Sequence, residues 1–350
     1  MFLINHHLQR RRRKMPKSKI KWGFFILVIA LVCFIGAVPA VSSAQQPVKL
    51  RFASFKIGSG WYVMAGVMAD IIKRNLPPGS TVDALPKSGG IGNPKLLGLK
   101  KAEIGFAFPM TANWAWNGKF RYKEKVRNIR AIAGGLDSYW VAGAVKANMD
   151  INSWADVKAK KMGLRICTQS KGSLSEFAAS QVLGEYGITY DALKGWGGDI
   201  LMKGFKEMVP ALKEGAIDGF LMMCTPFHPT WTEAAISRPL KFISLEDSII
   251  SQLGRKYGYT RSILPAGMFR GQKEDVVIIG FPTCLLARED IPSEVVYTIL
   301  KSIVDNTEKI QAAYKAFKAF DPKTAWKPEK VGGVPLHPGA EKFYKEMGWK

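Results

Sequence analysis

One arrangement of strands and helices occurs twice in this sequence, and it limits the possible folds more than any other feature. The first copy starts with an apolar strand at residues 50–55, a glycine turn and a helix, and it ends with a strand at 102–106. The second copy starts at 162–167 and ends at 216–220, where an acid, a glycine and a phenylalanine recur. Strands that alternate with helices form mostly parallel sheets covered on both faces. The sequence therefore predicts an α/β protein with two lobes.

The chain is long enough to divide between these lobes, because 350 residues can fill two domains. We predict that lobe I comprises residues 48–140 plus 276–350 and that lobe II comprises 141–275. Hinge strands near 139–145 and 276–286 would join them.

The first 44 residues have the order of a secretory signal. A basic block at 10–21 precedes an apolar run at 22–38, and small residues follow at 41–44. This order predicts a signal peptide cleaved after Ala44 and a mature protein in the periplasm. The alternative is an uncleaved membrane anchor, because the apolar run is close to the minimum length for a span.

The charge is strongly basic, with 51 Lys and Arg against 28 Asp and Glu. Residues 46–350 hold 43 of the basic residues and all 28 acids, a net charge of +15. Such a charge is typical of binding to nucleic acid, to an anionic membrane surface or to anionic solutes. The basic residues are dispersed among acids, without the basic stripe of a nucleic-acid-binding protein. We therefore predict no nucleic-acid partner, and the remaining alternatives are an anionic solute and a solvated basic surface.

Three turns rich in glycine and serine each precede a helix, around Ser59, Ser88 and Ser173. In the second turn, Asn93 followed by Pro94 has the pattern of an N-cap and first helical residue. The first amides of a helix have no intrahelical partner, and the positive end of the helix favours anions. Three such turns in two lobes predict a site that binds an anion without transforming it.

Signals for catalysis are weak by comparison. Gly58 and Gly60 partly match a dinucleotide fingerprint, but Val63 stands where the third glycine belongs. After the leader the chain has only His228 and His337, each beside proline, which excludes a multi-histidine metal site and favours structural roles. The three cysteines after the leader are predicted to be buried and inert. We predict no enzyme activity, no metal and no cofactor.

Several segments, in this order, resemble the solute-binding receptors of the TAXI group, which serve TRAP-type secondary transporters. They are Gly58-Ser59-Gly60-Trp61-Tyr62, Gly89-Gly90-Ile91-Gly92-Asn93, Gly172-Ser173-Leu174-Ser175-Glu176-Phe177, Gly215-Ala216-Ile217-Asp218, Ile263-Leu264-Pro265-Ala266-Gly267-Met268-Phe269, Val295-Val296-Tyr297 and Leu336-His337-Pro338-Gly339-Ala340. The resemblance covers residues 50–347. It implies a two-lobed periplasmic-binding-protein fold of the type II kind, hinge closure on a carboxylate, and membrane transporter subunits as partners.

The resemblance also implies which residues would line the site. Lobe I would contribute Ser59, Gly60, Trp61, Tyr62, Ser88, Gly89, Gly90 and Asn93, and lobe II would contribute Gly172, Ser173 and Ser175. One departure concerns Phe108, Met110 and Thr111, because relatives often have an Asp where Met110 stands. Met110 cannot pair with a ligand amine, so we hypothesise a carboxylate without an α-amino group and with an apolar or aromatic body. The alternative is that Phe108 and Met110 pack in the core and Thr111 compensates.

Two other functions remain compatible with the sequence. A receptor of the same fold could signal to a membrane sensor, and an enzyme could use a similar two-lobed fold. The neighbouring gene products would distinguish a transporter from a sensor, and a chemically altered ligand would indicate an enzyme.

Overall fold

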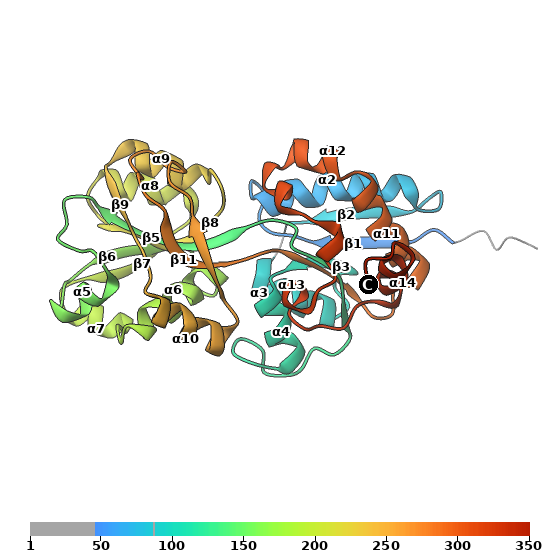
Figure 1. Cartoon of the computed structure of the whole chain (residues 1–350), viewed down its shortest axis with the longest axis horizontal. Coiled ribbons are helices and arrows are strands. Elements are labelled where there is room, and N and C mark those ends of the chain that lie inside the picture. Colours follow the sequence, from blue (N-terminus) through green and yellow to red (C-terminus); the bar gives the residue numbers. More distant parts are fainter. Residues whose placement is uncertain (1–45, 87) are drawn as a thin grey trace, which may run out of the picture. The chain divides into compact units, whose positions relative to one another are not determined.

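The computed structural model describes residues 46–86 and 88–350 (Figure 1). The predicted signal peptide, residues 1–44, lies outside these residues. In the described part of the chain, no helix has both the length and the apolar character needed to cross a bilayer.

The first sheet and the helices around it form what we call lobe I. The strand order is β2 (Thr81–Leu85), β1 (Lys49–Ala53), β3 (Ile104–Ala107), β12 (Cys284–Arg288) and β4 (Ile129–Gly134). The helices are α2 (Gly60–Asn75), α3 (Gly89–Gly98), α4 (Pro109–Asn117), α11 (Ser293–Asp305), α12 (Thr307–Ala313), α13 (Pro328–Val331) and α14 (Pro338–Glu346), with 3₁₀ turns η1 (Lys315–Ala319) and η2 (Pro322–Thr324).

The second sheet and its helices form lobe II. Its main strand order is β7 (Asp199–Met202), β6 (Arg165–Thr168), β8 (Gly219–Cys224), β5 (Tyr139–Lys146), β11 (Val276–Phe281) and β10 (Thr260–Leu264), and β9 (Leu240–Ile243) also pairs with β5. The helices are α5 (Trp154–Ala159), α6 (Leu174–Glu185), α7 (Tyr190–Gly195), α8 (Phe205–Lys213), α9 (Pro229–Ser237) and α10 (Asp247–Tyr257).

The predicted duplication is present in the topology. The order β2-β1-β3-β12 in lobe I corresponds to β7-β6-β8-β5 in lobe II. In each lobe three neighbouring strands are parallel and the fourth is antiparallel. The two-lobed α/β fold is therefore confirmed, although both sheets are mixed rather than mostly parallel.

The strand pairings also decide where the chain crosses between the sheets. It leaves the first sheet after β4 and enters the second at β5, and it returns between β11 and β12. The predicted lobe boundary at residue 276 differs from this, because it assigns β11 to lobe I. β11 pairs with β5 and β10 of the second sheet, so the return crossing consists of Pro282 and Thr283.

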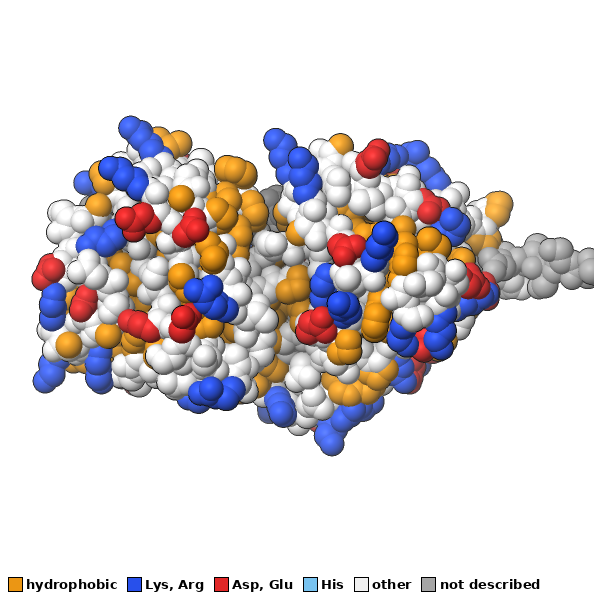
Figure 2. Space-filling view, viewed as in Figure 1, with side chains coloured by type: hydrophobic (Ala, Val, Ile, Leu, Met, Phe, Trp, Pro, Cys, Tyr) orange, Lys and Arg blue, Asp and Glu red, His pale blue; other side chains and the backbone are white. Residues whose placement is uncertain are grey.

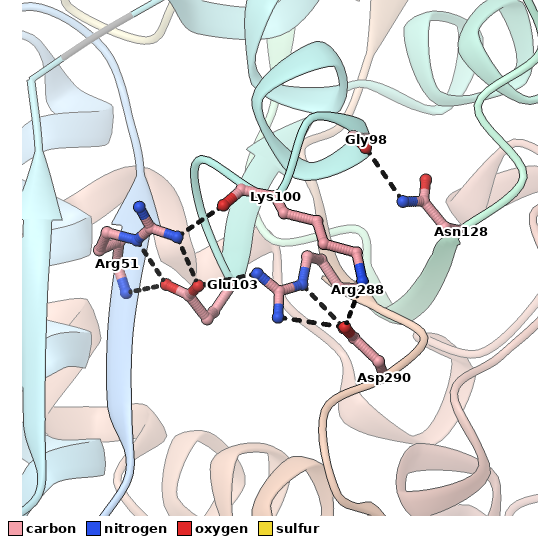
Figure 3. A network of polar contacts seen from close by, with 7 residues as sticks. All are labelled: Arg51, Gly98, Lys100, Glu103, Asn128, Arg288 and Asp290. Carbon is pink, nitrogen blue, oxygen red and sulfur yellow. Dashed lines mark hydrogen bonds and ion pairs between the residues drawn. The ribbon is translucent and has the colours of Figure 1, made fainter.

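A buried carboxylate lies at the equivalent position of each lobe, directly before β3 in lobe I and before β8 in lobe II. In lobe I, Glu103 accepts hydrogen bonds from the backbone and guanidinium of Arg51 at 2.7–2.9 Å and from Arg288 at 2.9 Å (Figure 3). The outer part of this network adds Asp290 and Lys100, which are more exposed.

Lobe II repeats the arrangement with different residues. Asp218 accepts from the backbone and guanidinium of Arg165 at 2.7–3.0 Å and from the Lys146 ammonium at 3.0 Å. The same backbone bonds recur as well, since Arg288 N donates to Glu103 O and Lys146 N donates to Asp218 O, each at 2.9 Å. The sequence echo at 102–106 and 216–220 therefore marks equivalent positions of the two lobes.

Two local predictions were wrong. Asn93 is not an N-cap: α3 begins at Gly89, and the Asn93 side chain instead donates to the carbonyls of Ala53, Ser54 and Phe106 inside the lobe. The apolar spacing of Val296, Ile299, Leu300 and Ile303 also predicts one helix over residues 293–320. The structure interrupts it at Asn306 and again at Tyr314, and the backbone of Tyr314 is extended.

Candidate functional site

A cavity of about 470 Å³ is lined by residues of both lobes. In the space-filling view a furrow separates the two lobes, and hydrophobic side chains are visible along it (Figure 2). The same view shows Lys and Arg scattered over both lobes rather than gathered in one patch (Figure 2).

Six helices begin at this cavity, as three equivalent pairs. Helices α2 and α6 follow β1 and β6, helices α3 and α8 precede β3 and β8, and helices α4 and α9 follow β3 and β8. The cavity wall contains the residue that caps or opens each of them: Ser59, Ser173, Ser88, Phe205, Phe108 and His228. The duplicated fold thus directs six positive helix ends at one volume.

The two capping serines have the same geometry. Ser59 Oγ accepts from Tyr62 N and Ser173 Oγ accepts from Glu176 N, each at 3.2 Å. These bonds hold the first turns of α2 and α6, as N-caps do. The first two backbone amides of each helix donate to no other residue in the described part of the chain. They belong to Gly60 and Trp61 in α2 and to Leu174 and Ser175 in α6. They remain available to an acceptor in the cavity.

Aromatic rings form one wall of the cavity. The Phe108 ring packs against Trp61 and Phe281, with centroids 4.7 Å apart in each case, and against Tyr139 at 5.1 Å. α3 comes close to this cluster because Gly90 has no side chain: a Cβ there would lie 2.6 Å from the Phe108 ring. This wall can pack against an apolar ligand body.

The charges around the cavity favour an anion. Among the described residues that line it, none is acidic, and Lys315 is the one permanent cation. His228 is neutral at ordinary pH because burial lowers its pKa to about 4. Four of the six helices, α2, α3, α4 and α9, have no acidic residue in the first turn to compensate the helix dipole.

Most of the residues singled out from the sequence lie together at this cavity. Ten of them line it: Ser59, Gly60, Trp61, Ser88, Gly89, Gly90, Phe108, Gly172, Ser173 and Ser175. They come from both lobes, so the three serine turns share a single cavity.

Four of the predicted site residues lie elsewhere. Tyr62 and Asn93 are not part of the cavity wall, and Asn93 is fully buried beneath it. Met110 is buried close to Gly258 of lobe II: a Cβ added to Gly258 would lie 3.2 Å from the Met110 Cβ. Thr111 is occupied by a reciprocal cap, since its hydroxyl pairs with the backbone N and O of Phe108 at 3.0 Å.

The sequence reading missed cavity residues at the ends of α8 and α9, chiefly Phe205 and His228. Structural roles were predicted for both histidines. His337 has one, because its Nδ1 accepts from Gly339 N at 3.2 Å and caps α14, whereas His228 also lines the cavity. The internal duplication could have predicted that the N-termini of α8 and α9 line the site, because these helices are the equivalents of α3 and α4.

None of the three cysteines in the described chain lines the cavity. Cys167, Cys224 and Cys284 are free and buried, as predicted, and burial raises the pKa of each thiol. Within residues 46–86 and 88–350 no group of His, Cys, Asp and Glu side chains is placed to hold a metal ion.

Two similar lobes, two crossing segments and a cavity lined from both sides define the two-lobed periplasmic-binding-protein fold. The chain belongs to the NMT1-like family, whose sequence profile matches residues 53–348.

Solved structures are similar to this chain at low sequence identity. MatC from Rhodopseudomonas palustris, solved with bound malate, is 15% identical, with a TM-score of 0.50 over 87% of this chain and 98% of that chain. A TctC solute-binding protein from Polaromonas is 14% identical, with a TM-score of 0.47 over 88% of this chain and 96% of that chain. At such identities the likeness concerns the fold alone.

Proposed function

We propose that this chain is an extracytoplasmic solute receptor of the TAXI group, which captures a small carboxylate between its lobes and delivers it to a TRAP-type secondary transporter. The observation that carries the proposal is the convergence of six helix N-termini on a cavity whose described lining has no acidic residue. Backbone amides and helix dipoles bind anions without full positive charges, so the site needs no arginine.

The mechanism that we propose is hinge closure. The crossings are short and are tied to each other, since Leu136 N donates to Thr283 O at 3.0 Å. An anion that accepts from the ends of α2 and α6 at once contacts both lobes, and this differential contact stabilises the closed form. The closed receptor is then the form that docks on the membrane subunits.

The lining also suggests the kind of carboxylate. Met110 does not select the ligand, because it lies outside the cavity wall. The lack of an acidic side chain in the described lining supports a carboxylate without an α-amino group, since a ligand ammonium would have no counter-ion. The wall of Phe108, Trp61 and Tyr139 favours a ligand with an apolar or aromatic body.

A calorimetric titration with a panel of acids tests this proposal. We expect 2-oxo acids and aromatic acids such as phenylpyruvate and benzoate to bind more tightly than glutamate. Mass spectrometry of small molecules that co-purify with the protein would identify the natural solute. Tight glutamate binding with no response to the other acids would contradict the ligand class.

Ser173→Ala is expected to weaken binding of the preferred acid by roughly 1–3 kcal/mol, because a carboxylate then loses one hydroxyl donor. Ser153→Ala removes the equivalent cap of α5, outside the cavity, and serves as the matched control for the loss of a cap. Titration of both variants separates the two effects. An unchanged affinity of Ser173→Ala would remove this hydroxyl from the site.

Delivery to a transporter requires its own experiment. Uptake of the identified acid should be lost from cells without this receptor and restored by the wild-type chain. Restoration of a transcriptional response without restored uptake would point to the sensor function instead.

A further inference from the structure

A buried carboxylate lies directly behind the cavity wall, at the crossing between the lobes. Asp137 is 2% exposed and lies in the segment that joins β4 to β5. One of its oxygens accepts from Thr283 N of the return crossing at 2.9 Å, and the other accepts from the Tyr314 hydroxyl at 3.2 Å. Asp137 therefore holds the two crossings together.

The same carboxylate lies close to the positive end of α2. A Cβ on Gly60, the first residue of that helix, would lie 2.9 Å from the Tyr314 hydroxyl, which is itself hydrogen-bonded to Asp137. The next residue, Trp61, donates from its indole N–H to Thr283 Oγ1 at 2.8 Å. Asp137 is therefore linked through Tyr314 to the N-terminus of α2, which lines the cavity.

No cation pairs with Asp137 among the described residues. The titratable groups that face it are Tyr139, Tyr314 and Cys284, and burial raises the pKa of each, so all three are neutral. Two lysines lie on neighbouring segments. Lys330, near Gly135, donates to the Thr324 hydroxyl at 2.6 Å, and Lys315, which follows Tyr314, lines the cavity. Burial raises the pKa of Asp137 itself to about 6, although hydrogen bonds from Thr283 and Tyr314 oppose the shift.

We propose that Asp137 couples anion binding to proton uptake, so that the cavity binds an anion more tightly when this carboxylate is protonated. The inference rests on the proposed function, because it needs an anion in the cavity. Its physical basis is that two negative charges near one helix end repel each other through a poorly hydrated wall. Coupling is reciprocal, so the bound anion must raise the proton affinity of Asp137 by the same factor.

The test uses benzoate and benzenesulfonate as probes in calorimetric titrations of the full-length protein from pH 5 to pH 8. The sulfonate stays ionised throughout this range, so any change in its affinity belongs to the protein. We expect roughly 5- to 150-fold tighter binding at the acidic end, the usual span of a coupling between two sites. Titrations in two buffers with different heats of ionisation should show net proton uptake near pH 7.

Asp137→Asn mimics the protonated side chain and can keep the bond from Thr283 N. We expect this variant to bind the probes at pH 8 as tightly as the wild type does at pH 5, with no pH dependence and no proton uptake. Asp247→Asn, which changes an exposed acid on α10, should keep the wild-type profile. If Asp137→Asn does not fold, the net proton uptake of the wild type, measured from its binding heats in the two buffers, still shows whether anion binding is coupled to protonation.

The outcomes separate this inference from the proposed function. Binding that is independent of pH and equal in the wild type and Asp137→Asn overturns the coupling and leaves the receptor function intact. Failure of both probes to bind either protein at any pH overturns the proposed apolar anion site, and the coupling with it.

The unfolding transition supplies a second readout. The folded-state pKa of Asp137 lies above its ordinary value, so its contribution to stability is complete at low pH and is lost as the pH rises through about 6. We therefore expect Asp137→Asn to remove a loss of stability that the wild type shows between pH 4 and pH 7. An identical pH profile in both proteins would contradict the buried, unpaired carboxylate.

Discussion

Ser59→Asp is expected to lower the affinity of the cavity for anions by roughly 100-fold or more while the fold stays intact. Aspartate is as good an N-cap as serine, and α2 has no other acid in its first turn. The new carboxylate would occupy the positive helix end that a bound anion needs. Two like charges about 4 Å apart repel by about 4 kcal/mol at an effective dielectric constant of 20, which exceeds the 2.7 kcal/mol that corresponds to 100-fold.

Two control variants assign this effect to charge. Ser59→Asn has the size of aspartate and caps a helix without a charge, so it should retain most of the affinity. Ser153→Asp places the same charge at the N-terminus of α5, outside the cavity, and should leave binding unchanged. Calorimetric titration with benzoate and circular dichroism on all three variants provide the measurements. Equal losses in Ser59→Asp and Ser59→Asn would show that steric exclusion, and not charge, controls the site.

Glu103→Gln is expected to destabilise the protein by about 3 kcal/mol at pH 7, because Arg51 and the largely buried Arg288 then lose their charged acceptor. The equivalent change in lobe II, Asp218→Asn, should cost a similar amount, since its partners have the same geometry. Guanidinium denaturation would measure both. Asp290→Asn, in the exposed part of the same network, should cost at most about 1 kcal/mol.

The pH dependence of these two variants follows from the pKa values of the carboxyl groups. Burial alone raises the pKa of Glu103 and Asp218, but the hydrogen bonds and charges of their Arg and Lys partners bring both below their ordinary values. Their contribution is therefore present above the pKa of the unfolded chain and is lost as the pH falls through the folded-state pKa. The difference in unfolding free energy between the wild type and each variant should therefore disappear toward pH 3. A gap that widens on acidification would contradict this assignment.

Local chemistry made part of the site predictable. Ser59 and Ser173 were placed in glycine- and serine-rich turns that each precede a helix, and in the structure both side chains cap that helix by accepting a backbone amide. The turn at Ser88 was found in the same way. Each of these signals is contained in a few consecutive residues, so no long-range contact was needed to read it.

The errors have the opposite cause. Asn93 has a good capping sequence, but three carbonyls from β1, β3 and their surroundings bind its amide and place it inside α3. Met110 was given a role in ligand choice on its sequence position alone, whereas in the structure it is buried near Gly258 and is not part of the cavity wall. Tyr314 was read as part of a continuous helix, yet the backbone leaves the helix there and its hydroxyl bonds to Asp137.

The sequence by itself determined the repeated unit of strand, turn and helix, because the period of apolar residues and the caps that set it are local properties. Only the tertiary structure decided that six helix ends share one cavity and that Asp137 lies behind it. Those relations depend on contacts between residues such as Asp137 and Thr283, which are 146 positions apart. Their free energy arises from the packing of two sheets and two crossings, and no short stretch of sequence records it.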